Sequence, residues 1–302
     1  MEKVLLVPYG GLGNQMFQIA AALSSTSRDV WVVSNWGFAR KNSGSKIEIE
    51  AWEFNSRVKF FTSPNGNNLS RRLLNFMLRL GAQNRRRILL RILELFTAPY
   101  FSLLIGHGTS VSVNRGLGFS KLSVQKRTML IGYFQCAFFA KSVINELLSS
   151  HPKHLSEYAL MLIEEAKSKS VLVVHIRRGD YVNEAFGVLS DSYYERALEI
   201  IKHDLFQEIW VFSDDIESAK LIHILKEKNN VKFIEDKTLE SSEVLEVMRF
   251  GSGFVIANSS FSWWAAQLRY KRIAQVVCPS PWFKFTKSPE GIIDDEWIAL
   301  SW

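Results

Sequence analysis

The chain contains 302 residues, of which 47% are hydrophobic and 22% are charged. This composition excludes a disordered or a fibrous protein, and the length is typical of about two domains. Lysine and arginine number 37 against 30 aspartates and glutamates, so the formal net charge is +7. Such a charge favours anionic partners, whether nucleic acid, anionic lipid or a phosphorylated ligand, and does not choose among them.

The amino terminus and the cysteines indicate the cellular compartment of the protein. No apolar run approaches the ~20 residues of a membrane-spanning helix, and the apolar stretch from Met1 to Pro8 is too short for a signal peptide. Cys136 and Cys278 cannot make a disulfide framework, and we expect both to be small buried hydrophobic residues. These features predict a cytoplasmic protein.

The first half of the chain begins with a strand, a glycine loop, a helix and a second strand. The strands are predicted at 4–7 and 30–33, and the helix opens at Asn14 after the loop Gly10–Gly13. The segment from Asn35 to Asn68 is polar and irregular, and no element is assigned to it. Further on, the pattern predicts strands within 107–120 and at 129–133, and a helix around 139–148.

Arginines gather between Arg71 and Arg91, interleaved with apolar residues and with no acid among them. The spacing predicts a basic amphipathic helix pair that is broken near Gly81. Two interpretations remain open: a surface lying on an anionic membrane, or an ordinary packed helix pair with solvated arginines. No zinc-finger spacing and no RNA-binding motif is present, so we expect no nucleic-acid partner.

The second half alternates strands with helices, which predicts a parallel sheet covered on both faces. The fold class is therefore α/β, with two Rossmann-like domains facing a cleft. The seam is expected between His151 and Lys169, giving domains 1–160 and 161–302, and the final residues can pack back on the first domain. The expected strands are 171–176, 209–212, 231–234, 254–257 and 273–277, and the expected helices are 192–203, 216–228, 242–250 and 260–269.

The first candidate site segment is the glycine loop before the first helix. Gly11 and Gly13 let the backbone approach a ligand closely, and a helix amino terminus favours anions. Asn14 and Gln15 add polar groups aimed at the same cleft. The dinucleotide-binding fingerprint is absent, since its third glycine and its acid are missing. A tight structural turn explains the glycines about as well as a ligand site does.

The second segment carries a histidine, two arginines and an acid at the end of a buried strand: His175, Arg177, Arg178 and Asp180. Burying two guanidinium groups without anionic partners is unfavourable, and Asp180 can neutralise only one of them. The other is then available for a phosphate. A structural Arg–Asp pair at a domain seam is the alternative, and we favour the ligand interpretation. The two arginines point to opposite sides if the strand continues through them.

Two more segments follow predicted strands. Asn258, Ser259, Ser260 and Phe261 lie between a strand and a helix, where a cap residue, hydroxyl groups and first-turn N–H groups form an anion site. Ser213, Asp214 and Asp215 follow another strand. Their acids either accept hydrogen bonds from a base or ribose, or cap the next helix.

No metal-binding pattern is present. The sequence has no Walker loop, no HExxH, no paired CxxC and no Asp-x-Asp. A diphosphate would have to be neutralised by arginines and helix amino termini, so we expect no metal site and no cofactor.

The motifs at 10–18 (GGLGNQMFQ), 132–135 (GYFQ), 175–182 (HIRRGDYV), 212–215 (FSDD) and 256–264 (IANSSFSWW) run in one order through nearly the whole chain. Together they resemble the bacterial α-1,2-fucosyltransferases of glycosyltransferase family 11. The resemblance implies a GT-B-like fold, an acceptor-side first domain, a second domain that binds GDP-fucose, and a metal-independent transfer that inverts the fucose anomeric carbon.

The resemblance also implies roles for single residues. His175, Arg177, Arg178 and Asp180 match the family's donor-binding motif. Ser259, Ser260 and Phe261 resemble a phosphate-binding turn of distantly related fucosyltransferases, and Asp214 or Asp215 resembles an acid facing guanine or ribose. Asn14 resembles an asparagine that reaches the reacting centre. The site residues thus expected are Asn14, Arg177 and Arg178 for catalysis, and Gly11, Gly13, Gln15, His175, Asp180, Ser213, Asp214, Asp215, Asn258, Ser259, Ser260 and Phe261 for the donor.

The expected reaction moves L-fucose from GDP-fucose to the 2-hydroxyl of a galactose-terminated oligosaccharide in surface glycan synthesis. The resemblance suggests that this acceptor is lipid-linked, and Arg71–Arg91 would then place the enzyme on the inner face of the membrane. Two alternatives stay open: another nucleotide-sugar transferase of GT-B architecture, and a non-catalytic protein that binds a sugar nucleotide.

Overall fold

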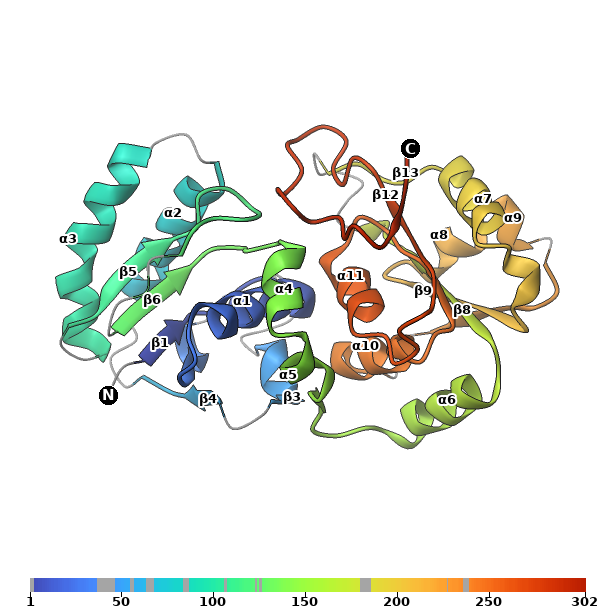
Figure 1. Cartoon of the computed structure of the whole chain (residues 1–302), viewed down its shortest axis with the longest axis horizontal. Coiled ribbons are helices and arrows are strands. Elements are labelled where there is room, and N and C mark those ends of the chain that lie inside the picture. Colours follow the sequence, from blue (N-terminus) through green and yellow to red (C-terminus); the bar gives the residue numbers. More distant parts are fainter. Residues whose placement is uncertain are drawn as a thin grey trace. The chain divides into compact units, whose positions relative to one another are not determined.

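The computed structural model describes residues 3–36, 47–54, 57–63, 68–83, 87–105, 108–122, 124, 127–179, 186–226, 228–235 and 239–302. The chain divides into two compact units (Figure 1). The first comprises Met1–His151 and Pro289–Ile292, and the second comprises Pro152–Ser288 and Ile293–Trp302. The chain thus passes into the second unit at His151, where the range for the expected seam begins.

The first unit is built on a parallel sheet with the strand order β4-β2-β1-β6-β5. Its strands are β1 (Lys3–Leu6), β2 (Val30–Val33), β4 (Val58–Phe61), β5 (Ser110–Val113) and β6 (Arg127–Ile131), beside the two-residue strand β3 (Trp52–Glu53). Its helices are α1 (Leu12–Ser25), α2 (Asn68–Gln83), α3 (Arg87–Ile105), α4 (Ala137–Ser142) and α5 (Ile144–Leu148), with 3-10 turns at Ser34–Trp36 and Glu48–Ala51.

The second unit has a parallel sheet with the order β10-β9-β8-β11-β12-β13. Counted from β8, this is the Rossmann order 3-2-1-4-5-6. The strands are β8 (Val171–Ile176), β9 (Glu208–Ser213), β10 (Val231–Ile234), β11 (Gly253–Val255), β12 (Val276–Pro279) and β13 (Ile298–Leu300), after the two-residue β7 (His151–Pro152). The helices are α6 (Glu157–Ser168), α7 (Asp191–Ile200), α8 (Ile216–Lys220), α9 (His223–Lys226), α10 (Ser241–Arg249) and α11 (Ser260–Gln267), with a 3-10 turn at His203–Leu205.

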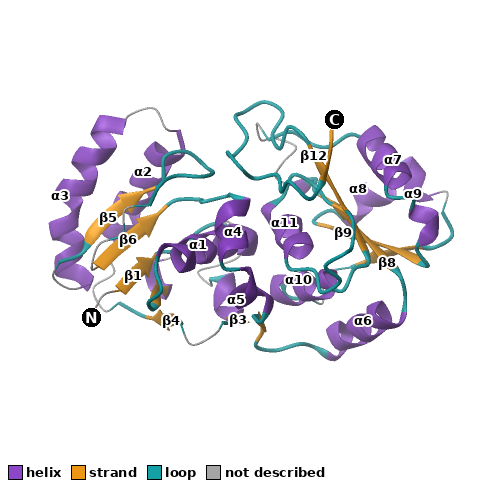
Figure 2. Cartoon of the chain, viewed as in Figure 1, coloured by secondary structure: helices purple, strands orange, loops and turns teal. Residues whose placement is uncertain are grey.

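Each sheet carries its own core. Strand β8 is buried along its whole length, as its continuous apolar sequence predicts for a central parallel strand. Its residues Leu172, Val174 and Ile176 pack in one cluster with Tyr194 and Leu198 of α7. Figure 2 shows the strands of both units with helices beside them. The expected α/β fold with two Rossmann-like units, the GT-B type, is confirmed.

Several expected elements differ from the structure at their ends. The helix expected at 216–228 is two short helices, α8 and α9, and the one expected at 139–148 is interrupted at Val143 between α4 and α5. The strand expected at 273–277 begins only at Val276, and Ile273 is 98% exposed. The sequence analysis missed β13 and also β4, whose four residues lie inside the segment left unassigned.

Gly81 does not break the basic helix pair. Helix α2 continues through it to Gln83, and the next residues that the structure describes begin α3. A Cβ at position 81 would lie 2.6 Å from the backbone oxygen of Asn114. This glycine therefore serves the close approach of α2 to the segment after β5 and not the end of a helix.

Candidate functional site

Three of the expected segments follow neighbouring strands of the second sheet. In the parallel register, Val174 of β8 faces Val255 of β11, and Ile176 of β8 faces Ser213 of β9. The segments after these strands therefore emerge at one edge of the sheet. The strand order reverses between β8 and β11, and at such a switch point open α/β sheets bind their ligands.

Arg177 forms an ion pair with an acid of the neighbouring segment. Its Nη1 lies 3.2 Å from Oδ2 of Asp214, and only 11% of the Arg177 side chain is exposed. The other carboxylate oxygen of Asp214 accepts the backbone N–H of Arg178 at 2.9 Å. A Cβ at Gly179 would lie 2.2 Å from Asp214 Oδ2, so the loop can approach this carboxylate only with glycine there.

Arg178 points to the other face of the sheet. Its Nη1 donates to the backbone oxygen of Leu189 at 2.9 Å, and its Nη2 lies 3.2 Å from Asp191, the first residue of α7. Burial raises the pKa of the nearby Tyr194 hydroxyl, and the charge of Arg178 acts against that rise. The protein itself thus holds the Arg178 guanidinium against α7.

Both arginines have acidic neighbours besides the expected Asp180. We expected Asp180 to neutralise one of them and leave the other without an acid. Asp180 lies outside the described residues, and each arginine has an acidic neighbour elsewhere, Asp214 or Asp191. A ligand phosphate at this edge would therefore meet arginines that are already held in place by carboxylates.

His175 is neutral at physiological pH. It is buried, and burial lowers its pKa to about 4 against the opposing charge of Asp214. Its ring lies 6.0 Å from the ring of Phe261, centroid to centroid. A neutral imidazole adds no positive charge to a phosphate site, so His175 links strand β8 to the first turn of α11 by packing.

The beginning of α11 has the cap geometry that the sequence predicts. Ser259 is the N-cap, and its hydroxyl accepts the N–H of Phe261 at 3.4 Å, a long hydrogen bond. Ser260 is the first helical residue. Asn258 donates its side-chain amide to the backbone oxygens of Phe186 and Gly187 at 3.3 and 2.9 Å, which anchors the turn.

The two acids after β9 have separate roles. Asp215 caps α8, accepting the N–H and the hydroxyl of Ser218 at 3.0 and 2.6 Å. These hydrogen bonds lower the pKa of Asp215. The Ser213 hydroxyl accepts the N–H of Asp215 and donates to its backbone oxygen, both at 3.0 Å. The cap interpretation therefore holds for Asp215, and Asp214 is the acid beside the arginines.

The glycine loop of the first unit differs from the expected anion site. Gly11 is the N-cap of α1, and Gly13 is buried in the first turn. The backbone N–H of Leu12 donates to the Glu48 carboxylate at 3.1 Å. A side chain of the protein thus already supplies an anion at this helix start, which favours negative charge.

Gln15 holds the loop together. Its amide nitrogen donates to the backbone oxygen of Gly10 at 2.7 Å, and its amide oxygen accepts the N–H of Ile49 at 2.8 Å. Gln15 is 1% exposed, so its side chain is committed to the protein and not to the cleft where we expected it. Asn14 is partly exposed and accepts a hydrogen bond from Gln135 at 2.7 Å.

Gln135 belongs to the residues that sequence reasoning did not select for the site. It follows β6, and β6 lies beside β1, so the segments after β1 and β6 meet at the switch point of the first sheet. Tyr9 and Tyr133 from these segments pack edge to face, with centroids 5.1 Å apart. The signal was present, since Gln135 comes shortly after the strand predicted at 129–133. Glu48 and Asp191 had no such signal, because folding alone brings them to their partners.

Within the part of the chain that the structure describes, no three histidine, cysteine, aspartate or glutamate side chains gather in a way that could hold a metal ion. The candidate residues fall into two groups. Arg177, Arg178, Asp214, His175 and Phe261 come together in the second unit, and Asn14 and Gln135 in the first.

Comparison with known proteins identifies the family of the chain. A family profile described as Glycosyl transferase family 11 matches residues 110–301. The chain is 28% identical over 290 residues to an alpha-1,2-colitosyltransferase of Escherichia coli, covering 91% of this chain and 90% of that protein. It is 29% identical over 315 residues to the O-antigen biosynthesis glycosyltransferase WbnK of Escherichia coli, covering 96% and 98%.

Among solved structures, the chain resembles a glycosyl transferase family 9 protein from Veillonella parvula DSM 2008, with a TM-score of 0.52 at 10% identity over 99% of this chain and 87% of that one. This likeness concerns the fold. The family profile spans the arginine segment after β8 and the serine segment after β11, together with most of the rest of the chain. The chain therefore belongs to glycosyl transferase family 11.

Proposed function

We propose that this glycosyltransferase moves L-fucose from GDP-fucose to the 2-hydroxyl of a galactose-terminated surface glycan, with inversion at the fucose C1 and without a divalent metal ion. The observation that carries the proposal is the ion-paired Arg177 at the switch point of the second sheet, at the same sheet edge from which the segment leading into α11 emerges. Arginine side chains and helix amino termini both bind phosphate groups. The alpha-1,2 linkage in the name of the colitosyltransferase supports a 2-hydroxyl acceptor.

In this reaction the acceptor hydroxyl attacks C1 of the sugar, and the bond between C1 and the β-phosphate oxygen breaks. Negative charge then grows on the β-phosphate of the departing GDP. Donors held in place before the reaction stabilise such charge, and this is usually the largest catalytic contribution. Arg177 and the N–H and hydroxyl groups of Ser259 and Ser260 would supply it here.

Side-chain direction favours Arg177 over Arg178 as the phosphate ligand. Strand β8 ends at Ile176, so the directions of the two arginines follow from their contacts. Arg177 pairs with Asp214, whose charge also acts on His175, and the His175 ring lies beside Phe261 of α11. Arg178 lies on the face of Ile176, which packs against α7, and it is held there by Leu189 and Asp191. Arg178 would then be a positioning residue for the loop.

Asn14 would contribute to the acceptor side. It is partly exposed, and its hydrogen bond with Gln135 fixes the direction of its amide. An amide cannot take up the proton of the attacking hydroxyl, so Asn14 would orient the acceptor and not act as a base. A transition state with oxocarbenium character needs little assistance from a base.

The proposal is tested by measuring nucleotide release with GDP-, UDP- and ADP-sugars, each with and without a galactoside and with and without a chelator. We expect release from GDP-fucose that needs the galactoside and survives the chelator. Arg177→Ala should lower kcat by about 10²–10³, whereas Arg196→Ala should leave it unchanged, because the partly exposed Arg196 of α7 bonds only to the backbone oxygens of Ser192 and Ser301 among the described contacts. Release from another nucleotide sugar alone, or full turnover in Arg177→Ala, would refute the assignment.

A second candidate donor follows from the comparison. The relative with 28% identity is named for colitosyl transfer and not for fucosyl transfer. Competition between GDP-fucose and a nucleotide-activated colitose for one preparation of the enzyme decides between the two donors. The preferred donor is the one with the higher kcat/KM.

A further inference from the structure

Helix α3 is apolar on two opposite faces. On the inner face Leu90 and Phe101 are buried and belong to the core of the first unit. On the outer face apolar side chains are exposed to solvent. They are Ile88 (78% exposed), Ile92 (44%), Leu95 (74%), Phe96 (79%) and Leu103 (73%).

These residues form one continuous row. Spacings of three, four and seven residues keep Ile88, Ile92 and Leu95 on one side of the helix, and likewise Phe96 and Leu103, while the adjacent Leu95 and Phe96 give the row its width. Within the described residues, α3 is the one helix that is long and apolar enough to cross a membrane. Its inner face packs into the core, so α3 lies along the unit, at its edge in Figure 1, and a bilayer can contact only the outer row.

Exposed arginines border this row. Arg91 lies on α3 between Ile88 and Leu95, and the neighbouring helix α2 exposes Arg71, Arg72 and Arg79. Leu69 and Phe76 of α2 are also 62% and 47% exposed. From residue 71 to residue 93 the sequence contains no acid. The surface therefore combines exposed apolar side chains with an excess of positive charge.

The apolar surface continues into a groove between α3 and the edge strand β5, with a volume of about 960 Å³. Ile88 and Leu95 belong to both the groove and the row, and Arg91 also lines the groove. The charged residues that line it are Arg91, Arg115 and Lys121 against Glu94 and Glu290, of which Glu94 and Arg115 form an ion pair.

We propose that this surface, the outer row of α3 with the exposed side of α2, binds the surface of a bilayer that contains anionic lipid. Apolar side chains in the acyl boundary and arginines among anionic head groups are the two contributions that hold a helix in a membrane interface. The contact lies on α3 as far as Leu103 and extends beyond the basic stretch Arg71–Arg91 expected from the sequence.

Charge favours a bilayer over a second copy of the chain. A two-fold symmetric dimer places the same patch of both copies in one interface. The arginines of both copies would then meet there with no acid from residues 71 to 93 to neutralise them. An anionic membrane supplies the missing negative charge.

The test uses the full chain without any nucleotide sugar, in co-sedimentation with vesicles of phosphatidylcholine alone or with added phosphatidylglycerol. We expect the protein to sediment with the anionic vesicles. Leu95→Ser with Phe96→Ser should lower the partition coefficient by at least about tenfold. The matched control is Leu205→Ser with Ile273→Ser, which removes side chains that are 74% and 98% exposed in the second unit. This control should leave the partition coefficient unchanged.

Arg72→Gln and Arg91→Gln should each weaken binding by about fivefold, which is the contribution of one arginine near an anionic surface. Wild-type protein that stays in the supernatant, or a Leu95→Ser/Phe96→Ser variant that sediments like wild type, overturns the proposal. The proposal is also overturned if the wild-type protein forms a concentration-dependent dimer but binds no vesicles, and if this variant abolishes the dimer. Thermal unfolding checks that the variants remain folded.

The inference goes beyond the proposed reaction and does not rest on it. A Leu95→Ser/Phe96→Ser variant should keep full turnover with a water-soluble galactoside, since these residues lie on the outer row of α3. Failure of the donor assignment would appear in the nucleotide assay alone, and failure of the membrane assignment in the vesicle assay alone.

Discussion

Asp214 holds Arg177 from the neighbouring strand end, with its Oδ2 3.2 Å from the Arg177 Nη1, and its second oxygen accepts the backbone N–H of Arg178. One carboxylate thereby fixes both a side chain and the loop that carries it. Arg177 is the residue we assign to the β-phosphate, so Asp214 affects the reaction by fixing the direction of the Arg177 side chain.

This relationship predicts that Asp214→Ala lowers kcat by about 10²-fold, because a misplaced catalytic group loses much of its effect. Asp214→Asn keeps an acceptor for the Arg178 N–H, so its kcat should lie between those of Asp214→Ala and wild type. The adjacent Asp215→Ala is the matched control: it removes the cap of α8, so it should lower the free energy of unfolding by about 1 kcal/mol with kcat unchanged. Equal kcat in all three variants would contradict the role of Asp214. Steady-state kinetics and urea unfolding measure both quantities.

Gly179→Ala should affect the same ion pair from the other side. The added Cβ would lie 2.2 Å from Asp214 Oδ2, so the carboxylate or the loop must shift. We expect a fall in kcat similar to that of Asp214→Ala, and little further loss when the two changes are combined, because both act on one contact. Gly11→Ala, where a Cβ meets nothing within 4 Å, is the control. Additive losses in the double variant would show that Gly179 acts independently.

The pKa of His175 predicts a loss of stability in acid. Its pKa is about 4 in the folded chain because of burial, below the ordinary value of 6.5. Between these two values the unfolded chain binds a proton that the folded chain does not, so the free energy of unfolding falls as pH decreases from 6.5 towards 4. His175→Asn should lack this contribution, which is on the order of 3 kcal/mol at most. Urea unfolding at a series of pH values tests this prediction. If the free energy of unfolding depends on pH in the same way in wild type and in His175→Asn, His175 is not a buried neutral histidine.

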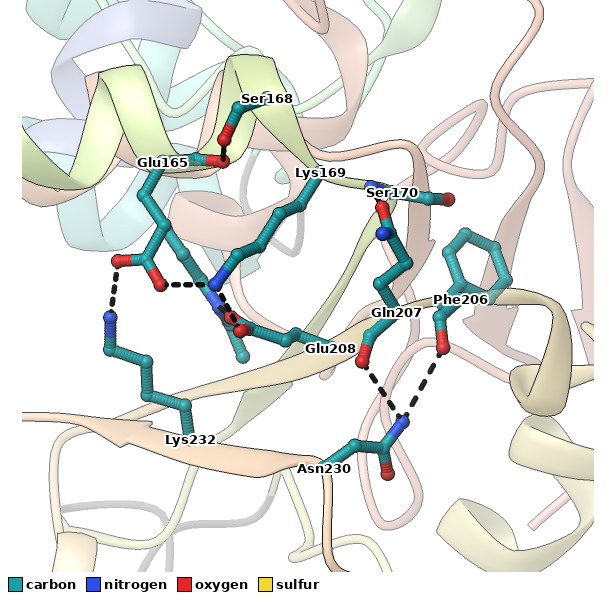
Figure 3. Close-up of polar contacts among 10 residues, drawn as sticks. Glu165, Ser168, Lys169, Ser170, Phe206, Gln207, Glu208, Asn230 and Lys232 are labelled. Atoms are coloured by element: carbon teal, nitrogen blue, oxygen red, sulfur yellow. Dashed lines mark hydrogen bonds and ion pairs between the residues drawn. The ribbon is translucent and has the colours of Figure 1, made fainter.

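An ion-pair network lies at the end of the second sheet where its strands begin, opposite the candidate site, and should affect stability alone. Figure 3 shows Glu165 of α6 between Lys169 and Lys232, with Lys169 also reaching Glu208. The hydrogen bond from Lys169, followed by that from Lys232, lowers the pKa of Glu165.

Glu165→Gln should therefore lower the free energy of unfolding by about 1 kcal/mol at neutral pH without changing kcat. The pKa is lower in the folded chain, so the stabilisation is present above the ordinary value of 4.5 and is lost as pH falls below it. Glu164→Gln, whose carboxylate is 71% exposed beside Lys167, should change little. A difference between wild type and Glu165→Gln that persists at pH 3 would contradict the ion-pair explanation.

Apolar patterning predicted most of the fold. The buried run of β8 and the amphipathic pattern of α7 specify their own secondary structure, because their packing partners require that periodicity. Short elements were predicted less well. Four-residue β4 is a short run within a mostly polar segment, and α8 and α9 together have the length of one helix.

The sequence by itself determined which segments carry the chemistry, because glycine loops, arginines and serines that directly follow predicted strands must reach one edge of a parallel sheet. Only the tertiary structure decided which side chains bind which partners. Asp214 and Asp191 pair with the arginines, Glu48 accepts the N–H of Leu12, and Gln15 accepts the N–H of Ile49, across separations in sequence that no local pattern encodes. Such contacts arise only when the sheets form, since they depend on strand order and register rather than on neighbouring residues.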